Sequence, residues 1–281
     1  MINVRYEAPE GQLAKSVSSF YRFEYQGDNL SEPGRADRAQ LRFQLHGGGE
    51  YRFTGGHVVE TFPITIICPT SAPFHSVASN PLIVFGWGML PAGWAGLVGK
   101  SDKDYCDTAI DAREIFGNSI MHWFEKLANA NSFDEQLAIA KAAAEVLHAK
   151  TEHAPIEFIN KVDNWLLEHV DPDVELLAHA TGLSPRQLER MTKRYYGMPP
   201  KKLARKYRAL RAAQMLAHGD SLDDNEVGMA FYDQSHLIRE VKQFTGLTPT
   251  QLRAGVSELT QATMEGRHAL GSKVSDLTSK S

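Results

Sequence analysis

The chain has 281 residues, a length that suits two domains of roughly 100–150 residues each. It is 42% hydrophobic and 23% charged, and its longest apolar stretch, around residues 82–97, is interrupted by glycines and prolines and falls short of the ~20 residues of a membrane span. Cys68 and Cys106 are too few for a disulfide framework or a zinc site, and the amino end lacks a secretion signal, so we expect a cytoplasmic protein.

The net charge of −4 is distributed unevenly along the chain. Residues 1–154 contain 13 Lys and Arg against 18 Asp and Glu, whereas residues 155–257 contain 14 against 13. Within the second part, residues 186–211 contain ten basic residues and a single acid, Glu189. This block predicts a surface that faces phosphate groups, and a solvated helix face is the alternative.

The first part of the chain has the pattern of short β-strands. Aromatic residues alternate with polar ones over residues 19–27, and glycines at 47–49 and 55–56 mark two hairpin-like connections. Three later segments, 64–70, 74–79 and 82–90, are rich in β-branched and aromatic residues. Strands at this spacing predict a small sandwich or barrel.

Four aromatic side chains in and after these strands are candidates for the wall of a ligand cavity: Phe74, Phe85, Trp87 and Trp94. The alternative is that they fill the core of the barrel. His46, His57 and His75 also fall in the strand region, but their spacing is not that of a metal site, so we expect no metal and no cofactor. The sequence lacks the fingerprints of nucleotide-binding loops, serine hydrolases and zinc proteases, so we predict no catalytic residue.

After Pro91 the pattern changes from strands to helices. In the stretch 132–150, Ser132 and Glu135 have the spacing of a capping box, and an apolar stripe begins at Phe133. This helix packs on the strands or against its copy in a second chain, and the sequence leaves both arrangements open. The second arrangement would make a homodimer.

A polar segment that ends in a proline, residues 151–155, predicts a domain boundary. We expect a strand-rich domain with following helices over residues 1–150 and an all-α domain over residues 155–257. The tail, residues 258–281, is polar and rich in small residues, so we expect it to be disordered. The predicted fold class is therefore α+β with two domains.

The helical domain contains a helix, a short glycine turn and a second helix. After a first helix over residues 156–170, the next one begins at Asp173 and ends at Gly182, a suitable left-handed terminator. Ser184 and Pro185 then open the following helix. This is the shape of a helix-turn-helix, whose second helix reads bases in the major groove.

The outward face of that second helix carries residue types that read bases. Leu188, at helical spacing with other apolar residues, faces the core, which leaves Arg186, Gln187 and Arg190 outside. Arginine suits a bidentate contact with guanine, and glutamine suits one with adenine. We predict that these three residues contact bases.

A second, diverged copy of the unit follows at a constant offset of 49 residues, with six identities that include Leu188 with Leu237 and Gly197 with Gly246. One predicted helix, about residues 200–218, joins the copies and spans about 27 Å, close to the ~34 Å between successive major grooves. By the offset, the second set of base-contacting candidates is Gln234, Ser235, His236 and Arg239. Candidates for phosphate contacts are Ser184, Lys193, Arg194, Lys201, Lys202, Arg205, Arg208 and Lys242.

Two segments, GLSPRQLERMTKRYYGMPPKKL and AFYDQSHLIREVKQFTGLTPTQLR, resemble the DNA-binding domain of the AraC/XylS family of bacterial transcriptional regulators. The resemblance implies two helix-turn-helix units that are joined by a linker helix and bind double-stranded promoter DNA, with RNA polymerase as a partner. It also implies a cupin-like amino-terminal domain that senses a small-molecule effector. Such a regulator acts at the nucleoid and does not contact a membrane.

The chain departs from the family pattern in the first helix of the second unit. Asn225 and Glu226 stand where the family has buried apolar residues, which implies a shifted or shortened helix. We expect Leu222, Val227, Met229 and Phe231 to supply the apolar contacts instead. Base reading is therefore assigned first to the first unit. Two other classes stay open: a cupin-like metal-dependent enzyme, and an interaction protein that binds nucleic acid without sequence specificity.

Overall fold

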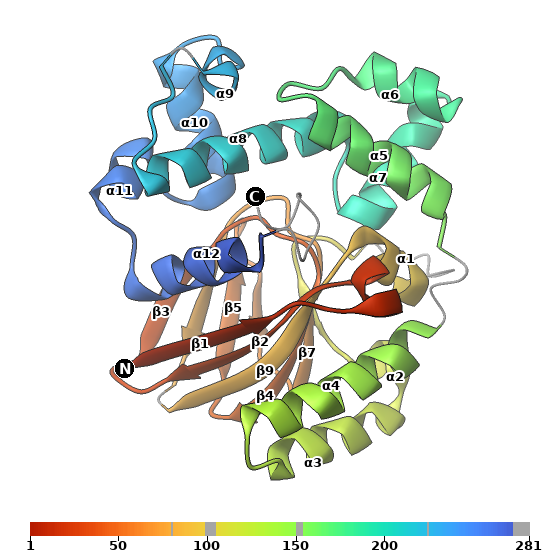
Figure 1. The fold of residues 1–281 in the computed structure, drawn as a ribbon, viewed down its shortest axis with the longest axis vertical. Helices are drawn as coiled ribbons and strands as arrows, with labels where there is room; N and C mark the ends of the chain where they lie inside the picture. Colours follow the sequence, from red (N-terminus) through yellow and green to blue (C-terminus); the bar gives the residue numbers. More distant parts are fainter. Residues whose placement is uncertain (80, 99–104, 150–153, 224, 272–281) are drawn as a thin grey trace.

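The computed structural model describes residues 1–79, 81–98, 105–149, 154–223 and 225–271, and Figure 1 shows a β-rich part below a row of helices. The strands come first in the chain and the helical part second, so the predicted α+β class is confirmed. None of the helices that the structure describes is both long and apolar enough to cross a membrane.

Two antiparallel sheets form the β-rich part. The larger one has the strand order β1-β2-β9-β4-β7-β10, and the smaller one has the order β3-β8-β5-β6. The strands of the larger sheet are β1 (Ile2–Glu7), β2 (Val17–Tyr25), β9 (Leu82–Met89), β4 (Gln40–His46), β7 (Ile64–Ile67) and β10 (Ala109–Asp111). Those of the smaller sheet are β3 (Leu30–Gly34), β8 (Phe74–Ala78), β5 (Gly49–Phe53) and β6 (Val58–Glu60).

The larger sheet buries its outer face under the helices that follow it. These elements are α1 (Pro91–Val98), α2 (Arg113–Phe116), α3 (Met121–Asn129) and α4 (Phe133–His148), with short 3-10 turns at Gly11–Lys15 and Asn118–Ile120. The indole nitrogen of Trp87 on β9 donates to Nε2 of His148 on α4 over 3.2 Å. Phe133, Ala140 and Ala144 are buried against the sheet. Of the two open arrangements for this helix, packing on the strands is therefore the one that the structure contains.

The cap of α4 follows the predicted residues with one change. The Ser132 side chain accepts from the Glu135 N–H over 3.1 Å, as expected. The Glu135 carboxylate accepts from the N–H of Asn131 over 2.9 Å instead of that of Ser132. The helix start is therefore correct, although the capping box is displaced by one residue.

The helical part contains two helix-turn-helix units on a long linker helix, as the repeat predicts (Figure 1). The first unit is α5 (Ile156–Glu168), α6 (Val174–Thr181) and α7 (Pro185–Tyr196). The linker helix is α8 (Pro200–His218). The second unit is α9 (Glu226–Met229), α10 (Gln234–Thr245) and α11 (Pro249–Ala254), and α12 (Glu258–Leu270) follows it.

The two units are unequal, because the first helix of the second unit has only four residues. Asn225 caps this helix by accepting from the Val227 N–H over 2.9 Å, which explains why a polar residue stands at its start. Leu222 and Phe231 are buried and Val227 packs beside them, as expected. Met229, however, is 70% exposed, so its predicted core role is wrong.

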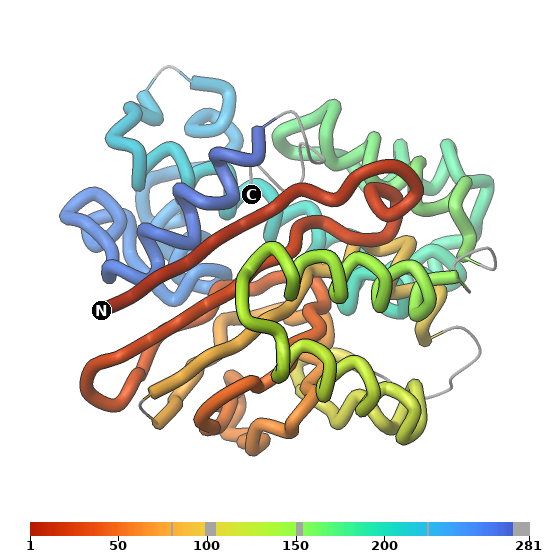
Figure 2. The backbone as a smooth tube through the Cα atoms, turned by 60° about the horizontal axis from the view of Figure 1, so that its bottom comes forward, coloured from red at the N-terminus to blue at the C-terminus, as the bar shows by residue number. Residues whose placement is uncertain are grey.

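The prediction of a disordered tail is wrong for residues 258–270. They form α12, which lies along β1, the first strand of the chain, in both views (Figures 1 and 2). Ser257 caps the helix, and its hydroxyl donates to the Glu32 carboxylate over 2.6 Å. Residues 272–281 lie outside the described residues, as do residues 150–153 at the predicted domain boundary.

Buried ion pairs fix the two units on the linker helix. The Glu240 carboxylate on α10 is 4% exposed and accepts from Arg205 over 2.6 Å and from Arg208 over 3.4 Å. Arg208 also pairs over 2.5 Å with Asp171, which lies between α5 and α6. The Arg211 guanidinium donates to backbone carbonyls at the end of α5. One face of α8 therefore holds both units by charge.

We expect Glu240→Ala to lower the free energy of unfolding by ~3 kcal/mol, because it takes a carboxylate from the buried Arg208, which keeps only Asp171, and from the half-buried Arg205. Urea unfolding of the full chain measures this loss. The matched control is Glu189→Ala, which removes the half-exposed pair with Lys193 and should cost less than ~1 kcal/mol. Equal losses in the two variants would contradict the assignment.

Candidate nucleic-acid interface and interdomain cavity

The start of α7 presents two arginines to solvent. Arg186 and Arg190 are exposed, and neither forms an ion pair with another described residue. Gly182 ends the preceding helix in the left-handed conformation, with φ 66°, and this turn aims the start of α7 outward. The predicted outward position of both arginines is confirmed, and their contact with bases stays a prediction.

Gln187 has a structural role that its residue type did not reveal. Its side-chain oxygen accepts from the Ser184 N–H over 3.0 Å, while the Ser184 hydroxyl accepts from the Gln187 N–H over 3.4 Å. This capping box occupies the oxygen that a bidentate contact with adenine needs. Ser184, predicted to contact phosphate, is held in the same cap.

The second recognition helix, α10, begins with a cap at Asp233 that also holds His236. Asp233 accepts from the His236 N–H over 2.7 Å, and the imidazole Nδ1 of His236 faces the Tyr232 N–H at 3.2 Å. The His236 ring packs on Phe231, with 5.7 Å between ring centroids. His236 is therefore half-buried and structural in this arrangement.

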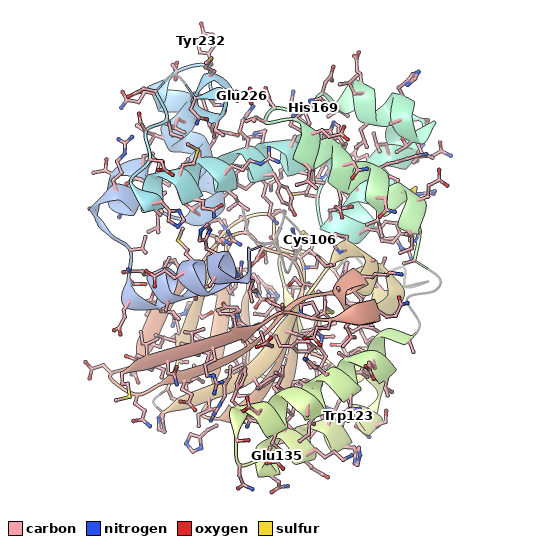
Figure 3. All side chains as sticks on the ribbon, viewed as in Figure 1. Cys106, Trp123, Glu135, His169, Glu226 and Tyr232 are labelled. Atoms are coloured by element: carbon pink, nitrogen blue, oxygen red, sulfur yellow. The ribbon has the colours of Figure 1, made fainter. Side chains whose placement is uncertain are left out.

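Three other predicted base contacts of this unit are exposed at or near the start of α10: Gln234, Ser235 and Arg239. Tyr232 is 93% exposed and projects outward from the end of the unit (Figure 3). Lys242, predicted to contact phosphate, is also exposed. The second unit thus keeps a polar surface that DNA could contact, with one candidate fewer than expected.

The basic block of residues 186–211 is only partly a surface. Its exposed members are Arg186, Arg190, Lys193 and Lys201, while Arg194, Lys202, Arg205 and Arg211 are half-buried and Lys206 and Arg208 are buried. Arg205 and Arg208, both predicted to contact phosphate, instead hold Glu240. The composition of the block does not reveal which members are exposed and which are buried, because burial depends on acids that are distant in sequence.

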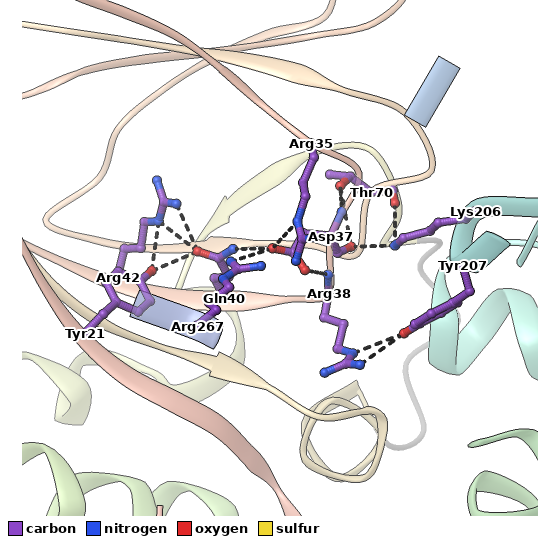
Figure 4. A network of polar contacts seen from close by, with 10 residues as sticks. All are labelled: Tyr21, Arg35, Asp37, Arg38, Gln40, Arg42, Thr70, Lys206, Tyr207 and Arg267. Atoms are coloured by element: carbon purple, nitrogen blue, oxygen red, sulfur yellow. Dashed lines mark hydrogen bonds and ion pairs between the residues drawn. The ribbon is translucent and has the colours of Figure 1, made fainter. Parts of the chain in front are cut away.

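Another part of the block holds the helical part on the β-rich part (Figure 4). The Lys206 ammonium donates to the Asp37 carbonyl over 3.1 Å and to the Thr70 carbonyl over 3.2 Å. Burial lowers the pKa of Lys206 to about 7, against the opposing effect of the Asp37 carboxylate. The Lys202 ammonium, another predicted phosphate contact, donates to the Ser71 hydroxyl over 2.8 Å.

The end of α7 also contacts the β-rich part. The Trp94 indole nitrogen donates to the Arg194 carbonyl over 3.3 Å, and the Cys106 thiol donates to the Gly197 carbonyl over 2.6 Å. Gly197 has φ 76°, and a side chain there would overlap Pro69. The thiol of Cys106 lies beneath the helical part (Figure 3). The first recognition helix is therefore anchored at its end and open at its start.

A cavity of about 210 Å³ lies between the β-rich part and the helical part. We call it the interdomain cavity, and its walls come from both sheets, α8 and α12. Its apolar surface includes Phe23, Phe74, Val77, Leu210 and Met264. Of the four aromatic residues predicted for a ligand cavity, only Phe74 lines it. Phe85, Trp87 and Trp94 are fully buried in the core of the larger sheet, so the alternative interpretation is correct for them.

The polar end of the interdomain cavity is built around Arg42. Its guanidinium donates to the Gln40 side-chain oxygen over 2.9 Å and to the Tyr21 hydroxyl over 3.1 Å (Figure 4). It also donates to the Tyr51 hydroxyl over 3.3 Å. Burial raises the pKa of Tyr21 to about 12, so its hydroxyl is neutral. No carboxylate among the described residues forms an ion pair with Arg42. The cavity therefore contains a guanidinium whose neighbours are neutral.

Arg42 was not predicted from the sequence, because only aromatic residues of the strand region were considered as candidates for the cavity wall. The alternation of Leu41, Arg42 and Phe43 places Arg42 on the opposite face from two fully buried neighbours. That face becomes a cavity wall only when the smaller sheet and the helices cover it. Within the described parts of the chain, no group of three or more His, Cys, Asp or Glu residues is arranged to hold a metal ion.

The paired helix-turn-helix units define the class of the carboxy-terminal part of this chain, a helix-turn-helix domain of the kind that DNA-binding regulators carry. Residues 177–255 match a protein-family model described as a helix-turn-helix domain, and the carboxy-terminal part of the chain carries a domain of the AraC type. The resemblance expected from the sequence is thereby confirmed.

Two curated relatives match the same part of the chain. The bifunctional transcriptional activator/DNA repair enzyme Ada of Escherichia coli is 35% identical over 95 residues, which are 34% of this chain and 27% of that protein. The regulatory protein ada of Salmonella typhimurium is 35% identical over 91 residues, which are 32% of this chain and 26% of that protein. The chain thus spans about a quarter of the length of these relatives.

A solved structure of ToxT from Vibrio cholerae has a similar fold over almost the whole length. The TM-score is 0.50 at 6% sequence identity, and the match covers 92% of this chain and 98% of that chain. At this identity the likeness concerns the fold alone. It supports the arrangement of a strand-rich part before a pair of helix-turn-helix units.

Arg190→Ala should weaken binding to a specific duplex by ~1–3 kcal/mol and relax the preference at one base pair, because Arg190 is exposed on the recognition helix. Fluorescence anisotropy with the selected duplex and with single-base variants measures both effects. An equal loss on specific and random duplexes would reassign Arg190 to phosphate.

Lys201→Ala should weaken binding to specific and random duplexes alike and reduce the slope of log affinity against log salt by about 1, since Lys201 is the exposed member of the block at the start of α8. Lys161→Ala is the control, because Lys161 pairs with Glu157 on α5. If the control lowers the slope as much, the phosphate contact of Lys201 is excluded.

Proposed function

We propose that this protein is a sequence-specific regulator whose two helix-turn-helix units read adjacent major-groove segments of promoter DNA under the control of a small molecule. The observation that carries the proposal is the cavity between the two parts. Its walls include Leu210, Ala213 and Gln214 of the linker helix, so a molecule bound there touches the helix on which both units are mounted.

Several features support base reading by the first unit before the second. Arg186 and Arg190 project freely from a complete helix-turn-helix. In the second unit, α9 is one turn long and His236 serves its own cap. The second unit then contributes mainly contacts to the DNA backbone, with Gln234 and Arg239 as its base contacts.

The chemistry of the interdomain cavity supports one class of effector. Burying a guanidinium costs free energy, and an anion that pairs with it offsets this cost. Among the described residues, Arg42 has only neutral oxygens as hydrogen-bond partners. Apolar side chains form most of the remaining wall. The effector is therefore an apolar molecule with one acidic group, which lies against Arg42.

We place the protein in the cytoplasm at the nucleoid, with promoter DNA and RNA polymerase as partners. We propose that the whole chain regulates transcription and does not catalyse a reaction. The match to Ada, whose name includes a DNA repair activity, is restricted to the helix-turn-helix region. A homodimer through α4 would have to use a face of this helix other than the one that packs on the sheet. Effector binding and specific DNA binding do not depend on such a dimer.

The experiment that tests DNA reading is selection of duplexes from a random pool by the purified full-length chain. A regulator should prefer its selected site ~10³-fold or more over random duplex at physiological salt. A selected site of two half-sites one helical turn apart would show that both units read bases. Equal affinity for all duplexes would instead identify a non-specific nucleic-acid-binding protein.

We expect Arg42→Met to weaken binding of the fluorescent probe anilinonaphthalene sulfonate by ~10-fold or more, because the sulfonate loses a charge-assisted hydrogen bond. Fluorescence titration of the intact protein and the variant measures the loss. Phenylnaphthylamine, which has the same rings without the acid, should bind both proteins equally.

The matched control for this titration is Arg113→Met, because Arg113 is an exposed arginine on α2 and neither it nor its partner Asp111 lines the cavity. It should leave the affinity for both probes unchanged. An equal loss of both probes in the Arg42 variant would show that Arg42 shapes the cavity without contacting an acid.

A further inference from the structure

Helix α12, the last helix that the structure describes, forms one wall of the interdomain cavity. Leu259, Thr263, Met264 and Arg267 recur at helical spacing and line the cavity. The helix lies along β1 at the edge of the larger sheet, and Figure 2 shows the two side by side. If α12 were removed, one side of the cavity would open to solvent.

The contact between α12 and β1 depends on a glycine. A Cβ atom at Gly266 would lie 2.3 Å from the ring of Tyr6, closer than any side chain tolerates. The backbone of α12 at Gly266 therefore lies directly against the ring of Tyr6 on β1. This fit gives α12 a defined seat that a larger residue would destroy.

The last turn of α12 is joined to the segment that seats the helical part. We call residues 35–38 the docking loop. The Ala36 N–H donates to the Phe244 carbonyl of α10 over 2.8 Å, and the Arg38 guanidinium donates to the Tyr207 hydroxyl of α8 over 3.2 Å. The second recognition helix and the linker helix thus both contact the docking loop.

Asp37 of the docking loop has contacts on two sides. Its carboxylate accepts from Arg267 of α12 over 2.7 Å, while its carbonyl accepts from Lys206 of α8 (Figure 4). Burial opposes ionisation of Asp37, yet Arg267, Arg35 and Lys206 together hold its pKa well below its usual range. Arg267 at 2.7 Å is closer to this carboxylate than Arg35, whose Nε lies 3.9 Å away.

We propose that α12 is a latch: when closed, it covers the interdomain cavity and, through Arg267 and Asp37, keeps the helical part docked in a state that binds DNA weakly. The inference rests on the proposed function. Opening the latch gives access to the cavity and loosens the docking loop. Lys202 and Lys206, now bonded to the β-rich part, then become free to reach phosphates. One helix thereby links access of an effector to affinity for DNA.

The first test measures access to the cavity, with no DNA or effector present. Ser76 on β8 lines the cavity and is half-buried, so Ser76→Cys is a reporter for a thiol reagent, and peptide mass spectrometry separates it from Cys68 and Cys106. In the full chain, Gly266→Leu should speed labelling of the reporter by ~10-fold or more, since the added side chain displaces α12 from Tyr6.

The matched control adds the same side chain to the exposed side of the same helix, as Ala269→Leu, and should leave the labelling rate unchanged. Arg267→Met is the second variant, which removes the ion pair without bulk and should also speed labelling. Circular dichroism checks that each variant keeps its fold. Equal labelling rates in all four proteins, the reporter alone and the three variants, would overturn the proposal.

The second test measures affinity for a random and a selected duplex. Arg267→Met should bind both ~5-fold or more tightly than the intact chain, with a salt slope steeper by about 1–2, because two lysines are released. Unchanged affinity with faster labelling would overturn the link to DNA. If the intact chain prefers no duplex, the proposed function fails, whereas the labelling test still decides whether α12 closes the cavity.

Discussion

The structure depends on the ion pairs and hydrogen bonds of one helix. Along α8, Arg205 and Arg208 hold Glu240 of the second unit, and Arg208 also reaches the first unit at Asp171. On a different side, Lys206 is buried against two carbonyls of the β-rich part. Removing a partner from a desolvated pair costs several kcal/mol, so this helix cannot shift against one neighbour without disturbing the others. The spacing of the two recognition helices and the position of the β-rich part are therefore set by residues of the same helix.

The sequence predicted well what depends on local chemistry. The cap at Ser184, the glycine terminus at Gly182 and the bounds of α8 follow from residues a few positions apart, and all were correct. Most strands up to Met89 were also recognised, because period-two patterns and turn glycines are local, whereas β1 and the short β10 were not predicted. The cavity was not, since its walls come from both sheets, α8 and α12, which meet only after folding. Arg42 could be placed on a strand face but not beside Tyr51.

The basic block shows why composition predicts a surface only on average. Ten basic residues within residues 186–211 suggested a single phosphate-facing stripe. A helix of this length presents all its sides, and both helix-turn-helix units and the β-rich part pack on α8, so buried acids and carbonyls bind part of the charge. Lys201 and Lys202 are adjacent in sequence, yet one is exposed and the other bonds to Ser71. The distinction depends on the angular position of each residue around the helix, which matters only once its neighbours are known.

The glycine beneath the Tyr6 ring has a consequence for how α12 forms. Glycine within a helix costs about 1 kcal/mol relative to alanine, and isolated helices of ~12–15 residues are marginal in water. Because α12 has 13 residues with Gly266 among them, its helicity must come from its seat on β1. Folding and attachment of α12 are then a single event, and the detached segment is a coil. The polar, small-residue composition predicted disorder because it reports only on the isolated segment and not on the seat that β1 provides. The same glycine that weakens the free helix allows the close approach that orders it.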